Sequence, residues 1–280
     1  MKVITRNFDL SGRGGEMRIV PLGDIHIGAG ACDEKLLKRT IDRIANDDNC
    51  YWIGMGDYCE FINVSDKRFD IRSIAKWVRL EHLTDIATAQ TERFLDFVKP
   101  ISHKCLALVA GNHEGFIASR YENAVYSRIV TEVKNMAGMP AADPLGVGMY
   151  GWLLLKFNRA GRNVTIKVNL HHGFVGGKLA GAKALNMQRW LWTHDCDLSL
   201  MGHSHNTSNQ IEAVECVTGA GKSYMQKRVG AYCGTFLKSI NEDGSSYSEN
   251  FGYFPLAIGS IEVVLKPGSD DQNDRVKIIT

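Results

Sequence analysis

The sequence predicts an α/β protein whose sheet has parallel components. Three short apolar runs support this, because each is followed by a polar tight-turn pair: 17–22 by Gly23-Asp24, 51–55 by Gly56-Asp57 and 106–110 by Gly111-Asn112. Segments with helical patterns separate the runs, and buried strands that alternate with helices are typical of βαβ units. With 280 residues, 44% of them hydrophobic, the chain is long enough to bury a substantial core.

The other elements follow from apolar spacing. A helix is expected over 33–46, where Leu36, Leu37, Ile41 and Ile44 recur at helical intervals. Further helices are expected over 66–98, 121–137 and 179–193, and a hairpin over 152–157 and 164–170. The remaining predicted strands are 198–201, 209–217, 227–236, 258–265 and 275–280, with a polar loop at 239–252. We expect a single domain over 1–280, with the helical segment 61–100 covering one face.

Composition excludes some classes of protein. The formal net charge of +2 is too small for the strong global field of a bulk nucleic-acid binder. The seven cysteines include no C-x-x-C pair, and several lie in apolar runs, so we expect reduced, structural thiols. The first residues contain no apolar signal region, and no stretch reaches transmembrane length, so a cytoplasmic protein without a membrane partner is expected.

Polar residues that suit metal ligation follow the predicted strands. Carboxylate, amide and imidazole groups, offered from several strand ends, are what a two-metal hydrolytic site requires. On an extended segment, Asp24 and His26 would point the same way, and so would His203 and His205. His171 and His172 alternate in direction, so only one of them is expected to reach the site. The candidate ligands are Asp24, His26, Asp57, Asn112, His172, His203 and His205.

The order Asp-x-His, Gly-Asp, Gly-Asn-His-Glu, His-Gly and Gly-His-x-His, which spans Asp24 to His205, resembles the calcineurin-like metallophosphoesterases. The resemblance implies an αββα sandwich, in which two packed mixed sheets are flanked by helices and two metals lie at the strand ends. It implies that Asp24, His26, Asp57 and His205 hold one metal. The other metal would be held by Asp57, Asn112, His172 and His203. Manganese is the expected metal, although Fe, Zn, Co and Ni suit the same donors.

The resemblance also implies a reaction. Two cations would clamp a phosphate ester and activate a bridging hydroxide for attack on phosphorus. His113 would face the substrate and protonate the leaving oxygen or steady its charge. Glu60 is the candidate carboxylate partner of His113, and a solvated loop carboxylate is the alternative interpretation of Glu60.

A phosphodiesterase or nuclease is the expected enzyme, with nucleic acid as a candidate substrate. Phe61 follows Glu60, and no nearby arginine matches the phosphate-gripping arginine of the protein phosphatases. Arg68, Arg72, Lys76 and Arg79 would form a basic helical stripe, which either tracks a polynucleotide or is a solvated face paired with Asp70 and Glu81.

Two other regions carry open interpretations. Gly176-Gly177-Lys178, with Gly181 and Lys183, is either a phosphate contact or an ordinary loop, and Trp190 and Trp192 are core aromatics or a stacking platform. A phosphomonoesterase, a small-nucleotide or lipid-linked phosphohydrolase and a non-catalytic scaffold are the alternative functions.

Overall fold

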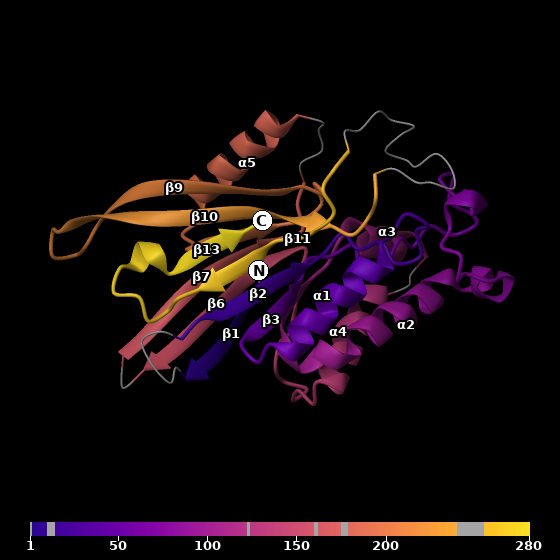
Figure 1. The fold of residues 1–280 in the computed structure, drawn as a ribbon, viewed down its shortest axis with the longest axis horizontal. Helices are drawn as coiled ribbons and strands as arrows, with labels where there is room; N and C mark the ends of the chain where they lie inside the picture. Colours follow the sequence, from indigo (N-terminus) through magenta and orange to yellow (C-terminus); the bar gives the residue numbers. More distant parts are fainter. Residues whose placement is uncertain (1, 10–14, 122–123, 160–161, 175–178, 240–254) are drawn as a thin grey trace.

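The computed structural model describes residues 2–9, 15–121, 124–159, 162–174, 179–239 and 255–280. Two mixed β-sheets pack against each other, and helices lie on their outer faces (Figure 1). This arrangement confirms the predicted α/β fold class with two packed sheets. The predictions for 240–252 and for Gly176-Gly177-Lys178 fall outside the described residues.

The first sheet has six strands in the order β13-β12-β2-β3-β4-β5. Strands β2 to β5 are parallel, whereas β12 runs antiparallel to both β2 and β13. The bounds are β2 (Met17–Leu22), β3 (Cys50–Gly54), β4 (Cys105–Val109), β5 (Gly146–Gly148), β12 (Glu262–Leu265) and β13 (Val276–Ile279). The parallel arrangement brings the carboxyl ends of β2, β3 and β4 to one edge of the sheet.

The second sheet has seven strands in the order β1-β6-β7-β8-β10-β11, with β9 paired to β10. Its β6–β7 pair is the predicted hairpin, and β7, β8 and β10 are mutually parallel. The bounds are β1 (Lys2–Asp9), β6 (Tyr150–Arg159), β7 (Arg162–His171), β8 (Leu198–Met201), β9 (Thr207–Val217), β10 (Ser223–Thr235) and β11 (Gly259–Ser260).

Three apolar clusters hold these layers together. Side chains from the inner faces of both sheets form one core, to which Ile19 and Ile53 contribute from the first sheet and Leu153 and Val168 from the second. A second cluster packs α1, α2 and α4 on the outer face of the first sheet, and a third packs α5 on the second sheet. The helices are α1 (Glu34–Asn46), α2 (Ile86–Val98), α3 (Asn112–Tyr121), α4 (Val125–Met136) and α5 (Ala180–Thr193).

The helix predicted over 66–98 is wrong for its first twenty residues. Only α2 is an α-helix there, and 66–85 contains the short 3-10 turns η1 (Ile71–Ser73) and η2 (Leu80–Thr84). The side chains of Asp66 and Asp70 each accept a hydrogen bond from the backbone N–H two residues on, at 2.9 Å. Such local bonds compete with helix formation. The four basic residues therefore do not form a helical stripe.

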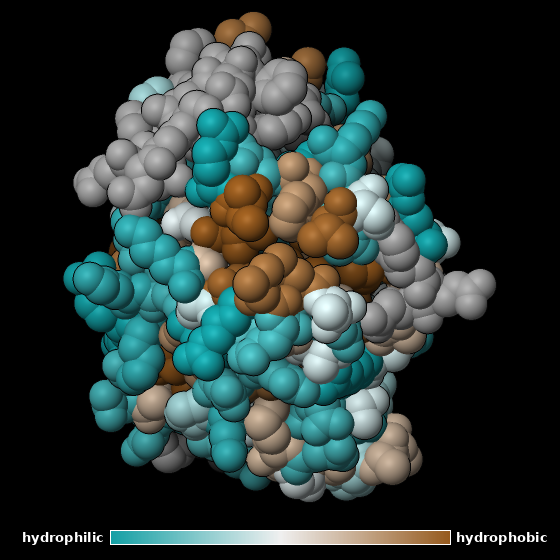
Figure 2. Space-filling model, turned by 90° about the vertical axis from the view of Figure 1, so that its right-hand side faces the viewer, coloured by the Kyte–Doolittle hydropathy of each residue, from teal (hydrophilic) through white to brown (hydrophobic). Residues whose placement is uncertain are grey.

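Three of the basic residues of this region pair with neighbouring carboxylates. Figure 2, which views the right-hand side of Figure 1, shows an apolar patch surrounded by hydrophilic side chains. Arg68 pairs with Asp66 at 2.8 Å and Arg72 pairs with Asp70 at 2.9 Å, so these cations are engaged locally. The pairing of Arg72 with Asp70, and of Arg79 with Glu81 at 3.7 Å, agrees with the alternative of a solvated segment.

Two smaller results bear on the other predictions. All seven cysteines are free thiols, and Cys50, Cys59, Cys105, Cys196 and Cys233 are buried. Within the described residues, no helix is both long and apolar enough to cross a membrane.

Candidate metal centre

Polar loops from five strands meet at one end of the two sheets. Asp24 follows β2, Asp57 follows β3 and Asn112 begins α3 directly after β4. From the second sheet, His172 follows β7, whereas His203 and His205 follow β8. Because the parallel strands of each sheet end on the same side, residues up to 181 positions apart are brought together here.

The backbone around these residues is in an unusual conformation. Among the described residues, six that are not glycine have positive φ angles, and five of them are predicted ligands: Asp24 (47°), His26 (56°), Asp57 (50°), His203 (64°) and His205 (57°). The expectation that Asp24-x-His26 and His203-x-His205 are extended is therefore wrong. Each left-handed residue costs about 1–3 kcal/mol, and such strain persists where the surrounding structure fixes it, often at functional sites.

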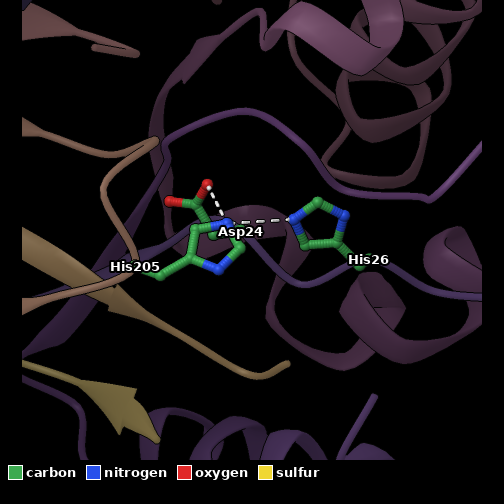
Figure 3. A group of neighbouring side chains, drawn as sticks. All are labelled: Asp24, His26 and His205. Atoms are coloured by element: carbon green, nitrogen blue, oxygen red, sulfur yellow. Dashed lines mark hydrogen bonds and ion pairs between the residues drawn. The ribbon is translucent and has the colours of Figure 1, made fainter. Parts of the chain in front are cut away.

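The first cluster consists of Asp24, His26 and His205, whose side chains converge in Figure 3. His26 Nε2 lies 3.3 Å from His205 Nε2. Asp24 Oδ2 accepts a hydrogen bond from the backbone N–H of His203 at 2.8 Å. Its other oxygen, Oδ1, is buried 3.4 Å from His205 Nε2 but accepts no hydrogen bond from the described residues. A buried carboxylate oxygen without a donor is rare in proteins, and a bound cation would satisfy it.

The second cluster consists of Asp57, Asn112, His172 and His203. Asn112 Oδ1 lies 2.9 Å from His172 Nε2 and 2.8 Å from His203 Nδ1, so one amide oxygen links two imidazoles. Asp57 Oδ2 lies 3.2 Å from His172 Nε2. The backbone carbonyl of Met55 lies 2.8 Å from His172 Nδ1 and so orients the ring.

Charge and burial act together on the Asp57–His172 pair. Burial opposes the charged form of both side chains, but each partner favours the charge of the other. The His172 imidazolium holds the pKa of Asp57 well below its usual range, and Asp57 raises the pKa of His172 to about 10. Burial and the nearby His172 lower the pKa of His203.

These residues fit divalent cations. In each of the groups Asp24–His26–His205 and Asp57–His172–His203, one donor atom from every residue lies within 4.8 Å of the others. Mixed carboxylate, amide and imidazole donors suit Mn, Fe, Zn, Co or Ni. The unsatisfied Asp24 Oδ1 is a second, independent sign of a missing positive partner.

His113 and Glu60 lie beside the first cluster, but not in the predicted arrangement. The Glu60 carboxylate contacts His26 Nδ1 at 2.7 Å, whereas His113 Nδ1 lies 2.6 Å from the backbone carbonyl of Glu60. Glu60 is thus neither solvated nor the direct carboxylate partner of His113, and its side chain is 20% exposed. The His113 ring packs edge-on against His26, with centroids 4.8 Å apart.

Nearby carboxylates also set the charge of His113. Burial alone would lower its pKa, but the charges of Asp57 and Glu60 and the bond to the Glu60 carbonyl raise the pKa of His113. Burial opposes ionisation of Glu60, but His26 lowers the pKa of Glu60 to about 2. His113 is therefore held in a position and an environment that favour its protonated form.

Glu114 is a positioning residue that the sequence analysis did not single out. Its buried carboxylate accepts hydrogen bonds from the backbone N–H groups of Asp57 (2.9 Å), Tyr58 (2.8 Å) and Gly111 (2.7 Å). It therefore ties the loop after β3 to the loop after β4. A signal was present, because Glu114 completes the Gly-Asn-His-Glu motif, but the motif alone does not say what the carboxylate contacts.

Other candidate residues lie elsewhere. His171 turns away from His172, and its Nδ1 accepts a hydrogen bond from the backbone N–H of Gly173 at 2.7 Å. Lys183 is buried and donates to the Ser204 carbonyl and to Asn206 Oδ1, so it supports the loop of His205. Trp190 is partly buried and bonded to Asn169, whereas Trp192 is 55% exposed.

Comparisons with known proteins identify the family to which the chain belongs. Residues 17–207 match the family model of the calcineurin-like phosphoesterases. Similar solved structures include a metallophosphoesterase from Sphaerobacter thermophilus (12% identity, 94% of this chain and 87% of that chain, TM-score 0.40). Vps29 from Entamoeba histolytica in complex with zinc (10%, 94% and 90%, 0.39) and the Haemophilus influenzae NAD nucleotidase (10%, 96% and 50%, 0.40) are also similar. No curated protein matches the chain.

Proposed function

The chain belongs to the calcineurin-like phosphoesterase family, whose model covers residues 17–207, and from this premise we propose that it is a dinuclear-metal phosphoesterase that prefers phosphodiesters. The observation that carries the proposal is the presence of two donor clusters at one end of the sheets, the first of which contains a buried Asp24 oxygen that accepts no hydrogen bond from a described residue. A donor set of this kind on a strained backbone is typical of a functional site.

Each cluster would hold one cation, and Asp57, a member of the second cluster, would bind both cations, as the family resemblance implies. Asp24, His26 and His205 would bind the first, and Asn112, His172 and His203 the second. When bound, the cations supply Lewis-acid stabilisation of the phosphate and an activated water nucleophile. The mixed oxygen and nitrogen donors agree with Mn²⁺, which we propose as the native metal.

His113 would act on the leaving group. Its Nδ1 is engaged by the Glu60 carbonyl at 2.6 Å, and its backbone N–H donates to Asp57 Oδ1 at 2.9 Å. The first contact orients the ring and the second holds its backbone, which would leave Nε2 as the nitrogen that meets the substrate. Because Asp57 and Glu60 raise its pKa, the ring is able to carry the proton that the leaving alkoxide needs.

The charge around the centre favours a diester over a monoester. A phosphate monoester carries about 1.5–2 negative charges at pH 7, whereas a diester carries a single charge. In the described residues, no lysine or arginine forms an ion pair or hydrogen bond with the side chains of either cluster or of His113. Beside the cations, the positive charge that would face the substrate is therefore that of His113 and not of a lysine or arginine bound to these side chains. A nucleic acid is one such diester, and a cytoplasmic enzyme acting on it is our working model.

A panel of four substrates tests this proposal. Gently purified protein is analysed for bound metals and then assayed with Mn²⁺ on bis-p-nitrophenyl phosphate, p-nitrophenyl phosphate, and single- and double-stranded DNA. We expect the diester to be cleaved faster than the monoester, and DNA cleavage would extend the activity to nucleic acid. Cleavage of the monoester alone would favour a phosphomonoesterase or a small-nucleotide phosphohydrolase. Inactivity on all four with both metals bound would favour a scaffold.

A further inference from the structure

Strand β9 forms an open edge of the second sheet. Among the described strands it pairs only with β10, and the β9–β10 hairpin extends to the left of Figure 1. β9 has 11 residues, whereas the edge strands β1, β5 and β13 have 8, 3 and 4. It contains no proline or lysine, and its pairing with β10 is regular from Thr207 to Val217. A long, regular edge strand without protective residues is a template for pairing with another strand.

The hydrogen bonds at the two ends of the hairpin show which backbone groups of β9 are open. The Asn206 carbonyl accepts a hydrogen bond from the Gly234 N–H at 2.8 Å. At the other end, the Thr218 N–H donates to the Lys222 carbonyl at 2.9 Å. Because both backbone groups of every second residue face the same neighbour in an antiparallel pair, the even-numbered residues face β10. The odd-numbered residues in 207–217 therefore direct their N–H and C=O groups to the open edge, where no described residue bonds to them.

The exposed face of β9 carries large apolar side chains. The odd-numbered side chains share this face, and they include Ile211 and Val217, which are 58% and 68% exposed. The other face packs against α5, whose Trp192 donates to the Glu212 carboxylate at 3.1 Å. β9 thus combines an open backbone edge with exposed apolar side chains. These are the two features from which strand addition gains its affinity and its specificity.

Two charged side chains near the same edge have no partner in the described part of the chain. Glu215 of β9 and Lys227 of β10 form no ion pair or side-chain hydrogen bond with any described residue. Lys227 lies directly beside Ala213 in the β9–β10 register, so it belongs to the same face as Glu215. A face with one free acid and one free base can complement a second copy of itself, because the two signs then face each other across the edge.

We propose that β9 pairs antiparallel with the β9 strand of a second copy, about a two-fold axis at Val214, so that the chain is a homodimer with one continuous sheet. In this register Ile211 lies opposite Val217 of the second copy, and the two-fold axis generates the same apolar contact again. The odd-numbered residues in 211–217 exchange backbone hydrogen bonds across the axis, which are the bonds that the open edge lacks.

The same register brings the free charges together. Ala213 lies opposite Glu215 of the second copy, and Lys227 is the neighbour of Ala213 on β10. The Cα atoms of Lys227 and of that glutamate are then two strand spacings apart, about 10 Å, which the two long side chains span over the small alanine. Symmetry provides the ion pair twice.

Charge also selects this register over the one with the longest overlap. An axis at Glu212 would align the whole of β9 with itself, but it sets Glu212 opposite its own copy. Like charges directly opposite each other destabilise a strand pair. The axis at Val214 instead sets Glu212 opposite Cys216. It also sets Glu215 opposite Ala213, so no two acids lie directly opposite each other.

Sedimentation equilibrium of the full chain, at concentrations from micromolar to near-millimolar, tests the proposal. We expect a mass that rises with concentration towards twice the 31.1 kDa of one chain. Ala213→Pro removes an outward N–H but no bond to β10, and proline is tolerated at such positions of an edge strand. It should weaken the dimer by about tenfold or more, because the symmetric interface loses two hydrogen bonds. Ala213→Ser keeps the N–H and is the matched control, which should dimerise like the parent.

Two charge reversals test the register. In Glu215→Lys the facing side chains are all positive, and in Lys227→Glu they are all negative. Each variant alone should therefore dimerise about tenfold more weakly than the parent at low ionic strength, where exposed charges are least screened. Mixed in equal amounts, the two variants should form a heterodimer about as tightly as the parent, because every reversed side chain then faces the opposite sign.

The proposal is overturned if the mass stays at 31.1 kDa near millimolar concentration. It is also overturned if Ala213→Pro, with an intact fold by circular dichroism, dimerises as tightly as Ala213→Ser. If Ala213→Pro unfolds, the charge variants decide. A mixture that associates no more tightly than either charge variant alone overturns the register and with it the proposal. None of these measurements involves metal or substrate, so they do not depend on whether the proposed phosphoesterase activity is correct.

Discussion

In the first cluster a buried Asp24 oxygen accepts no hydrogen bond from a described residue, whereas in the second cluster Asn112 contacts both imidazoles and Asp57 contacts that of His172. The two clusters therefore differ in what a cation would meet or displace on binding. At the first cluster it meets an oxygen that accepts no hydrogen bond from the described part of the chain, and the Glu60 carboxylate orients His26. At the second it must displace a proton from His172, whose pKa is raised to about 10 by Asp57. Cation binding at the two clusters should therefore differ in its dependence on pH and on supporting residues.

The largest loss of activity is expected on substitution of Asp57, which we assign to both cations. Asp57→Asn keeps the shape of the side chain but removes the charge that we assign to both cations. Phosphodiesterase activity should fall by more than about 10³-fold, because both cations stabilise the transition state. Turnover of bis-p-nitrophenyl phosphate and metal content measure the loss. Full activity in this variant would remove the assignment of the site.

A control variant and a second ligand variant distinguish loss of metal binding from loss of the fold. Asp48→Asn, at an exposed carboxylate, should keep activity and metal content. His203→Ala removes a ligand of the second cluster only, so it should abolish activity while the first cluster still binds one cation. Circular dichroism should show an intact fold in all three variants.

His113→Ala should have the next largest effect, and on turnover rather than on metal binding. Loss of a general acid typically lowers the rate by about 10²–10⁴-fold. His113 Nδ1 contacts a backbone carbonyl, so its removal leaves the ligands of both clusters in place. Elemental analysis beside the kinetics checks the role. A collapse of metal occupancy in this variant would instead identify His113 as a ligand.

Glu60→Gln should affect the first cluster selectively. The carboxylate lies 2.7 Å from His26 Nδ1, and a carboxylate behind a ligating histidine typically improves metal affinity by about 10–100-fold. The amide is nearly isosteric and keeps the backbone carbonyl that His113 uses. We expect weaker binding of one cation and little change at the other, measured by calorimetric titration with Mn²⁺. Equal weakening at both would show that the clusters are not independent.

The sequence predicted which residues would meet, but not how they meet. Glycine-bounded polar pairs after apolar runs are local signals, so the ends of β2, β3 and β4 were recognised together with Asp24, Asp57 and Asn112. The left-handed backbone at these residues depends on contacts between distant loops. The contact between Glu60 and His26 has the same origin, since 34 positions separate the two residues.

Two errors in the predicted elements have a similar cause. The N-terminal strand β1 was not predicted, because its pairing partner is β6, with Ile4 opposite Leu153. A short alternating segment gives no sign of a partner so far along the chain. In 66–85, apolar and basic residues at helical intervals were misleading, since Asp66 and Asp70 bind the backbone locally and prevent a helix. Tertiary context and side-chain competition, rather than periodicity, decide both regions.

The smallest predicted effect is the pH dependence of the free energy of unfolding, which tests the second cluster alone. In metal-free protein, the raised pKa of His172 contributes stability that is complete below about pH 6.5, the usual pKa of histidine, and declines as pH rises towards 10. The lowered pKa of Asp57 contributes stability above about pH 4 that is lost as pH falls further. The pair is therefore most stabilising between these limits, and unfolding by urea from pH 5 to 8.5 should show an alkaline decline. His172→Gln should flatten that decline.

Added Mn²⁺ should stabilise the protein more as pH rises, because the cation requires neutral imidazole. If metal stabilisation were the same at pH 6 and pH 8.5, the second cluster would not be protonated in the way its contacts indicate.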